Sequence, residues 1–149
     1  MEQSLHYLLM AAHSAVHKEV FARLRDADLS SGQPKVLDHL HVHDGDSQKD
    51  IARGCHIEPG SLTTLLKGME AKGLVERRSL NGNRKNSHIF MTDKGRAADA
   101  RVQQAFSEME AVAFQGIDEE ERARFLQTLG KISANLDNYN ERSDDHDRQ

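Results

Sequence analysis

Residues 47–95 read SQKDIARGCHIEPGSLTTLLKGMEAKGLVERRSLNGNRKNSHIFMTDKG, and they contain the clearest structural signals of the chain. Pro59 suits the first position of a helix, where its missing N–H is harmless, and Gly73 suits the position just past a helix end. Between them one apolar face recurs at helical spacing: Leu62, Leu65, Leu66 and Met69. The opposite face is small, polar and mildly basic: Gly60, Ser61, Thr63, Thr64 and Lys67. Such a face suits a helix that enters a DNA major groove, although an ordinary amphipathic surface helix shows the same pattern.

A shorter helix is predicted just before this one. Ser47, with Asp50 three residues on, resembles a capping box in which Asp replaces the usual Glu. Ile51 and Ala52 begin an inward face, and residues 55–57 make a tight connection into the next helix. Two short helices joined in this way predict a helix-turn-helix.

After the second helix the hydrophobic period changes to that of a strand. Residues 74–78 and 87–91 are strand-like, and an Asn-Gly pair between them is a strong hairpin-turn signal. The loop at residues 81–86 has no apolar residue and contains two adjacent cations, Arg84 and Lys85. A helix-turn-helix followed by a basic hairpin is a winged helix, and its wing would place these cations at the minor groove. A solvated loop is the alternative.

The order of these motifs resembles the MarR (multiple antibiotic resistance regulator) family of bacterial transcription factors over about residues 5–136. The family's wing usually reads Asp-Arg-Arg shortly before a Leu-Thr-x-x-Gly segment. Here residues 83–85 read Asn-Arg-Lys and residues 91–95 read Met-Thr-Asp-Lys-Gly, so Arg84 matches the wing arginine. The chain departs from the family pattern at Asn83, where Asp is usual, and at Thr64 and Gly68, where basic residues are common. The resemblance implies the family role with a base-reading pattern of its own.

The chain of 149 residues is long enough for one compact domain. We expect a mainly α fold with a small β-hairpin wing: a winged helix-turn-helix lobe at residues 30–96, with dimerisation helices at 4–25 and 97–138. Apolar stripes continue along these outer helices beyond what the lobe needs for its own core, which predicts a homodimer. The family uses its first and last helices in this way. Residues 140–149 contain no large apolar side chain and are expected to form a disordered tail.

The formal net charge is −4, but the charges are unevenly distributed along the chain. Residues 47–96 carry ten Lys and Arg against five Asp and Glu, whereas the remainder carries ten against nineteen. Phosphate binding responds to the local field, because screening limits electrostatic reach to about 8 Å at physiological salt. The lobe is therefore locally basic, and the acidic remainder would discourage DNA from the wrong face.

Enzymatic function is not expected. The sequence lacks a Gly-x-Gly-x-x-Gly, a phosphate-binding Gly-Lys-Ser loop, a His-Glu-x-x-His and a nucleophile elbow, and no cofactor is predicted. No apolar run is long enough to span a membrane, and Glu2 stands where a signal peptide would be basic. The single cysteine excludes an internal disulfide. These features predict a cytoplasmic protein with no membrane partner.

Histidines and the single cysteine are candidates for a second site. By the resemblance, His13, His17 and His39 could line an effector crevice between the dimer helices and the lobe. His13 and His17 have the i, i+4 spacing of metal ligands, but no cysteine or carboxylate cluster accompanies them, so no metal site is predicted. Cys55 lies between the two helices of the helix-turn-helix. It could sense oxidants, or it could be a small buried apolar residue.

These patterns predict a homodimeric, sequence-specific transcriptional regulator, acting as a ligand-responsive repressor on a near-palindromic operator of double-stranded DNA. Ser61, Thr63 and Thr64 would contact base edges. Phosphate contacts are expected from Lys67, Arg77 and Arg78, and wing contacts from Arg84 and Lys85. Small aromatic or phenolic compounds are frequent effectors in the family, so the resemblance implies such a ligand. Two alternatives remain open: a metal-binding protein built on the histidines, and a winged helix used only for protein contacts.

Overall fold

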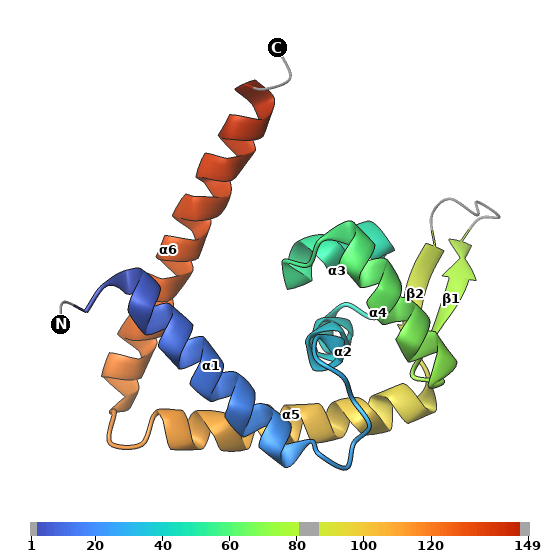
Figure 1. Cartoon of the computed structure of the whole chain (residues 1–149), viewed down its shortest axis with the longest axis horizontal. Coiled ribbons are helices and arrows are strands. Elements are labelled where there is room, and N and C mark those ends of the chain that lie inside the picture. The colour runs from blue at the N-terminus through green and yellow to red at the C-terminus, as the bar shows by residue number, and fades with distance from the viewer. Residues whose placement is uncertain (1–2, 81–86, 147–149) are drawn as a thin grey trace. The chain divides into compact units, whose positions relative to one another are not determined.

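The structure, a computed structural model, describes residues 3–80 and 87–146. Its elements in chain order are α1 (Leu5–Arg23), α2 (Gln33–Val42), α3 (Gln48–Cys55), α4 (Pro59–Ala71), β1 (Val75–Ser79), β2 (Ser87–Met91), α5 (Asp93–Ala113) and α6 (Glu119–His146) (Figure 1). The chain forms two compact units, Met1–Met109 and Glu110–Gln149. The predicted fold class, mainly helical with one antiparallel hairpin, is confirmed.

The helix boundaries around the helix-turn-helix follow from local chemistry. The Ser47 hydroxyl accepts a hydrogen bond from the Asp50 amide at 3.2 Å, as the predicted cap requires. Pro59 opens α4, and Gly73 follows its end with a φ of 73°, a left-handed conformation that favours glycine. Between α3 and α4, His56 also adopts a left-handed conformation, with a φ of 53°, which makes the connection tight.

The core of the first unit lies between α2, α3, α4 and the hairpin. Its fully buried large side chains are Val36, Leu37, Leu40, Ile51, Leu62, Leu66, Met69, Ile89 and Val102. Three of the four residues on the predicted apolar face of α4 are in this set, and Leu65 is partly buried. Each such side chain contributes roughly 1.5–3 kcal/mol when it is removed from water.

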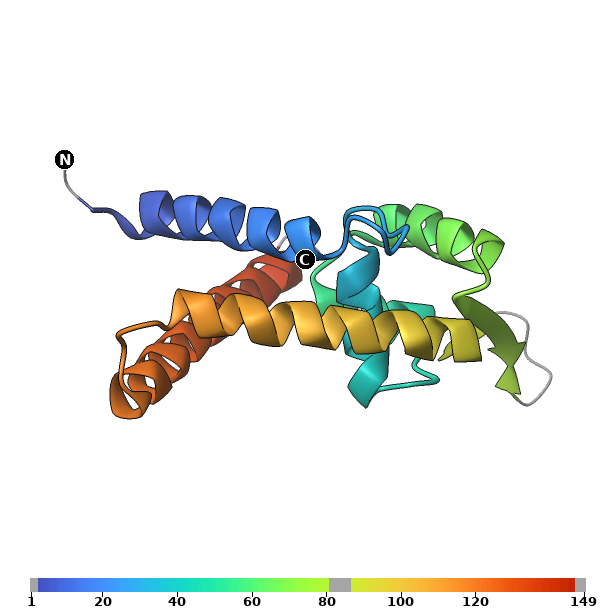
Figure 2. The ribbon, with the colours of Figure 1, turned by 90° about the horizontal axis from the view of Figure 1, so that it is seen from below.

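Polar contacts join α2, and the segment that follows α1, to α5 within the first unit. Figure 2 shows α2 crossing α5, and there His41 Nδ1 lies 2.5 Å from Oδ2 of the buried Asp99. The Gln103 amide donates to Asp38 on α2 at 2.8 Å. After α1, the Arg101 guanidinium pairs with Asp26 at 2.5 Å and holds the pKa of that carboxyl below its usual value. The buried Asp99 carboxylate has His41 as a partner and is therefore not isolated in the interior.

The hairpin is fixed to the segment that precedes α3. β1 and β2 are antiparallel, with Val75 opposite Met91 and Arg77 opposite Ile89. On the far side of β2, the Gly45 amide donates to the Ile89 carbonyl at 2.8 Å, and the Ile89 amide donates to the Asp46 carbonyl at 3.0 Å. β2 is thus hydrogen-bonded along one edge to β1 and along the other edge to residues 45 and 46, which holds the wing from both sides.

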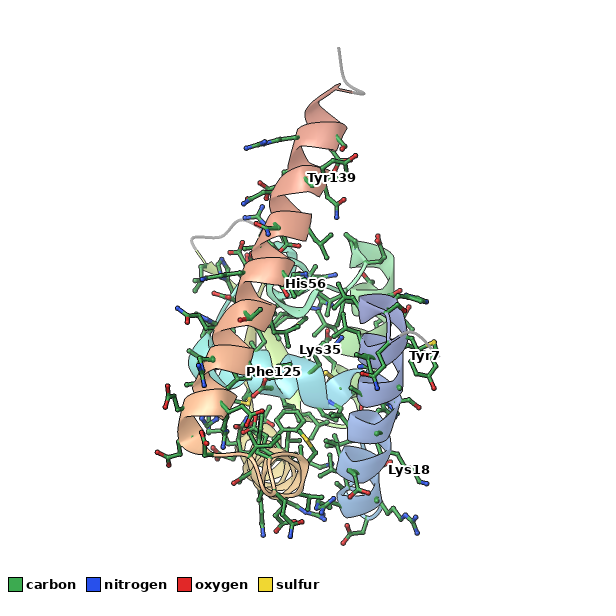
Figure 3. The ribbon with its side chains drawn as sticks, turned by 90° about the vertical axis from the view of Figure 1, so that its left-hand side faces the viewer. Tyr7, Lys18, Lys35, His56, Phe125 and Tyr139 are labelled. Atoms are coloured by element: carbon green, nitrogen blue, oxygen red, sulfur yellow. The ribbon has the colours of Figure 1, made fainter. Side chains whose placement is uncertain are left out.

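The second unit is dominated by α6. Among the residues of α6 whose side chains the structure describes, none is buried. Phe125 makes an edge contact with Phe114, and Arg122 lies over the Phe114 ring at 4.4 Å. Phe125 and Tyr139 mark the length of α6 in Figure 3, and they are 53% and 70% exposed.

The structure differs from the prediction at the end of α6. The helix continues to His146, whereas the sequence predicts a disordered tail over residues 140–149. The reason is that no Pro or Gly follows Gly130, so no residue interrupts the helical backbone once the apolar stripe has ended. None of the helices in the described ranges is both long and apolar enough to cross a bilayer.

Candidate nucleic-acid interface

The outward face of α4 presents the small polar side chains that the sequence predicts. Ser61, Thr64 and Lys67 are exposed, and Gly60 has open space around it. The Thr64 hydroxyl donates to the Gly60 carbonyl at 3.4 Å within the helix. Figure 1 shows α4 lying between α3 and the hairpin. The helix therefore offers a narrow surface without bulky groups, which a DNA groove could accommodate.

Thr63 stands apart from the other predicted base-reading residues, because its hydroxyl already makes two hydrogen bonds. It donates to the Pro59 carbonyl at 3.0 Å and accepts from the Gln48 side-chain amide at 2.7 Å. Gln48 is the first residue of α3, so this contact joins the two helices of the helix-turn-helix.

Arg77 connects the wing to both of these helices. Its Nε donates to Glu70 on α4 at 2.5 Å, and its Nη1 donates to the side-chain oxygen of Gln48 on α3 at 2.8 Å. Arg77 and Glu70 side chains are 30% and 34% exposed, so their ion pair is partly screened by solvent. The guanidinium lies beside the candidate interface, and its partners are side chains of the lobe itself.

Arg78 lies on the opposite face of β1, since successive strand residues alternate. It pairs with Glu76 and stacks over the Phe90 ring, with its guanidinium carbon 4.4 Å from the ring centroid. This face borders a polar hollow of about 400 Å³ that Asp44, Glu76, Asp93 and Arg96 also line. The two predicted phosphate-binding arginines are thus separated by the strand, and each has an acidic partner.

The wing-tip residues Arg84 and Lys85 lie outside the described residues. The strands that carry the wing are described, and they are positioned by the register of Ser79 opposite Ser87.

The predicted effector residues do not lie in one place. His13 and His17 line a hollow of about 310 Å³ whose wall is mainly apolar, completed by Val16, Val20, Phe21, Ser31, Gly32, Pro34, Lys35, Asp38 and Phe106. The His17 ring stacks on Phe21 with centroids 4.5 Å apart. His39 borders a different hollow, and its Nε2 lies 2.8 Å from Asp46 Oδ2. The helical spacing of His39 with His43 could not reveal this pairing, because Asp46 lies in the following loop.

Cys55 is buried at the end of α3, with its sulfur 3.6 Å from the Lys35 carbonyl oxygen. Burial raises the pKa of its thiol above the ordinary value. A raised pKa reduces the thiolate fraction, which is the reactive form, so the environment favours the apolar interpretation over an oxidant sensor. In the described parts of the chain, no three His, Cys, Asp or Glu side chains are placed to hold a metal ion.

Gln48 and Glu70 belong to the candidate interface through their bonds to Arg77, and the sequence patterns did not single them out. Gln48 has no special pattern around it, and Glu70 reads as one more charge on an amphipathic helix. Their role depends on Arg77, which is 29 residues from Gln48 and 7 from Glu70. Only the packing of the hairpin against α3 and α4 brings the three together.

A short helix with an exposed small polar face, supported by a second helix and flanked by a hairpin, defines a winged helix-turn-helix protein. Solved structures share this fold. Transcriptional regulator PA3341 matches with a TM-score of 0.82 and 33% identity, over 91% of this chain and 99% of that one. The S. aureus MepR–DNA complex gives 0.79 and 27%, over 91% and 99%. The transcriptional repressor CouR, bound to a 23-mer DNA duplex, gives 0.79 and 26%, over 87% and 92%.

The sequence comparisons specify the family. A sequence model of the MarR family matches residues 27–85. The HTH-type transcriptional regulator TtmR of Methylorubrum extorquens (strain PA1) is 31% identical over 102 residues, covering 68% of this chain. The chain spans about half the length of this curated relative, 52%. The chain belongs to the MarR family of transcriptional regulators, as the resemblance implied, and these relatives are regulators rather than enzymes.

Proposed function

We propose that this chain is a sequence-specific DNA-binding repressor that acts as a homodimer on a near-palindromic operator. The observation that carries the proposal is the exposed polar face of α4, held beside a hairpin in the same arrangement as relatives solved on DNA. In this proposal α4 enters a major groove, and Ser61, Thr63 and Thr64 approach base edges. Lys67 supplies a phosphate contact beside them.

The wing and the local charge support the same function. Residues 47–96 carry twice as many basic as acidic residues, although the whole chain has a net charge of −4. Arg84 and Lys85 are proposed to contact the flanking minor groove, where negative potential is strongest. Arg77 and Arg78 are proposed to contact phosphates by exchanging their acidic partners for DNA, which makes their contributions smaller than those of unpaired cations.

The exposed apolar residues of the outer helices support a homodimer. The exposed large apolar side chains of α1 are Leu5, Tyr7, Leu8, Leu9, Met10 and Val16, and those of α6 are Phe125, Leu126, Leu136 and Tyr139. Apolar surface on this scale marks an interaction site. Two-fold symmetry would then place two α4 helices in half-sites about one turn of DNA apart.

The hollow that His13 and His17 line is the proposed effector site. Its wall is formed by α1, by α2 with the segment leading into it, and by Phe106 of α5. A small aromatic compound fits its mostly apolar wall, with Lys35 at the edge as a partner for an acidic group. The ligand would bind more tightly to an arrangement of the lobes that does not fit DNA than to the DNA-bound arrangement. This difference in affinity sets how far the ligand lowers operator binding.

Substitution of cations at the proposed interface tests the function. We expect Lys67→Ala and Arg84→Ala each to weaken operator binding about tenfold, or about 1.4 kcal/mol, because each removes a charged contact to DNA. Lys18→Ala is the matched control, since Lys18 is an exposed cation on α1 (Figure 3). Fluorescence anisotropy with a duplex selected from a random pool measures the affinity. Absence of salt-dependent binding by the unmodified protein would contradict the proposal and favour a winged helix used for protein contacts.

A further inference from the structure

A chain of hydrogen bonds with a fixed direction links the wing, α3 and α4. Arg77 donates to the Gln48 side-chain oxygen at 2.8 Å, the Gln48 amino group donates to Thr63 at 2.7 Å, and the Thr63 hydroxyl donates to a backbone carbonyl of α4 at 3.0 Å. A guanidinium can only donate, so the oxygen of the Gln48 amide must face Arg77 and its amino group must face Thr63. Because a hydroxyl has one proton, that proton is directed to the Pro59 carbonyl.

We propose that Gln48 is a positioning residue for base recognition: it holds the Thr63 hydroxyl as a hydrogen-bond acceptor toward DNA. The inference rests on the proposed DNA-binding function and deepens it. Gln48 itself need not touch a base, since its amide joins Arg77 to Thr63. Its effect is exerted through Thr63.

The free capacity of the Thr63 hydroxyl defines the base chemistry. The hydroxyl has two lone pairs, and the Gln48 amino group occupies one of them. The remaining lone pair can accept a hydrogen bond. The hydroxyl cannot donate to a base without breaking its bond to the Pro59 carbonyl. In the major groove, the donors are the amino groups of adenine N6 and cytosine N4. Thr63 is therefore expected to favour adenine or cytosine over guanine or thymine as the base that it faces.

Arg77 makes this selection dependent on the wing. If Gln48 lost Arg77, its amide could turn over and present the oxygen to Thr63, which would force the hydroxyl to donate to Gln48. In the lobe without DNA, a second bond of Arg77, to Glu70 on α4 at 2.5 Å, holds the guanidinium in place. In the proposed complex, a phosphate that replaces Glu70 takes over this role. Arg77, on the first strand of the wing, thereby fixes the direction of the hydrogen bonds at Thr63 on α4.

The test compares base discrimination in the full-length wild-type protein and variants. Duplexes are first selected from a random pool by the wild-type protein, and each half-site position is then replaced in turn. We expect Gln48→Ala and the isosteric Gln48→Glu to reduce discrimination at one symmetric pair of positions at least fivefold. Thr63→Val is expected to reduce it at the same positions, and Gln48→Ala with Thr63→Val should reduce it no further than Thr63→Val alone.

The control and the readouts separate positioning from simple loss of structure. Gln104→Ala removes an exposed amide that bonds Glu108 at 3.1 Å within α5, and it should leave discrimination unchanged. Gln48→Glu keeps the size of the side chain and the acceptor for Arg77, so it should remain folded, and thermal melting checks this. Wild-type discrimination in folded Gln48→Glu, or loss at positions different from those of Thr63→Val, would overturn the inference. Absence of sequence-specific binding by the wild-type protein would instead overturn the proposed function, and the inference with it.

Discussion

The helices α4 and α6 have similar amphipathic patterns, but their apolar faces differ in burial. On α4, Leu62, Leu66 and Met69 are fully buried within the chain. On α6, Phe125, Leu126 and Leu136 are between 47% and 57% exposed. The sequence pattern predicts that one face of a helix is apolar. Whether that face is buried depends on other elements that cover it.

This difference separates a region that covers its own apolar faces from a region whose apolar face is exposed. The lobe has three helices and a hairpin around one centre, so its apolar faces meet each other. The apolar face of α6 is left without an equivalent cover in the described residues. Substitutions in the two regions should therefore have effects of different kinds: loss of folding stability in the lobe, and loss of assembly in α6.

The largest effect is expected from Leu66→Ala in the core of the lobe. Leu66 is 0% exposed, and its truncation removes apolar burial and leaves a cavity. We expect the free energy of unfolding to fall by about 3 kcal/mol. Urea denaturation followed by circular dichroism measures the change. Leu80→Ala is the control, because Leu80 is 45% exposed and should cost less than about 0.5 kcal/mol. Equal losses from the two substitutions would contradict the assignment of the core.

A somewhat smaller effect, and one on assembly, is expected from Leu126→Glu in α6. A carboxylate at this 47% exposed position would be desolvated in the proposed dimer but hydrated in a monomer. We expect dimer dissociation to become about a hundredfold more favourable, or about 2.7 kcal/mol, with operator binding weakened in parallel. Analytical ultracentrifugation measures the dimer. Gln127→Glu adds the same charge on the neighbouring exposed position and serves as the control. A dimer that tolerates Leu126→Glu would place the interface elsewhere.

The sequence predicted the helix-turn-helix and the hairpin well because the ends of these elements are set by local chemistry. Pro59 and Gly73 have strong conformational preferences of their own, and the Ser47 cap needs only the amide three residues later. The end of α6 was harder to predict. Residues 140–146 have a polar composition, which is compatible with both a tail and an exposed helix, and composition does not distinguish between them.

The candidate interface could be predicted only in part, for a physical reason. The small polar face of α4 is encoded by helical periodicity, so Ser61 and Thr64 could be selected from the sequence. Side-chain partners across elements have no such periodicity. Their contacts depend on the packing of α3 against the hairpin, which decides that Gln48 meets Arg77 and that His39 meets Asp46.

The smallest effect is expected from Glu70→Gln, which tests whether Glu70 keeps Arg77 from binding DNA. In the proposed complex, Glu70 competes with phosphate for Arg77 and repels DNA, so neutralising it should strengthen binding. The pair is about one-third exposed, with side-chain exposures of 30% and 34%, and solvent screening keeps the gain small. We expect affinity to rise about threefold, or about 0.7 kcal/mol, and the salt dependence to steepen by up to about one phosphate contact. The control is Glu19→Gln, which removes a carboxylate paired with Arg23 at 2.7 Å on α1. Weaker binding by Glu70→Gln would mean that Glu70 orients Arg77 for DNA rather than withholding it.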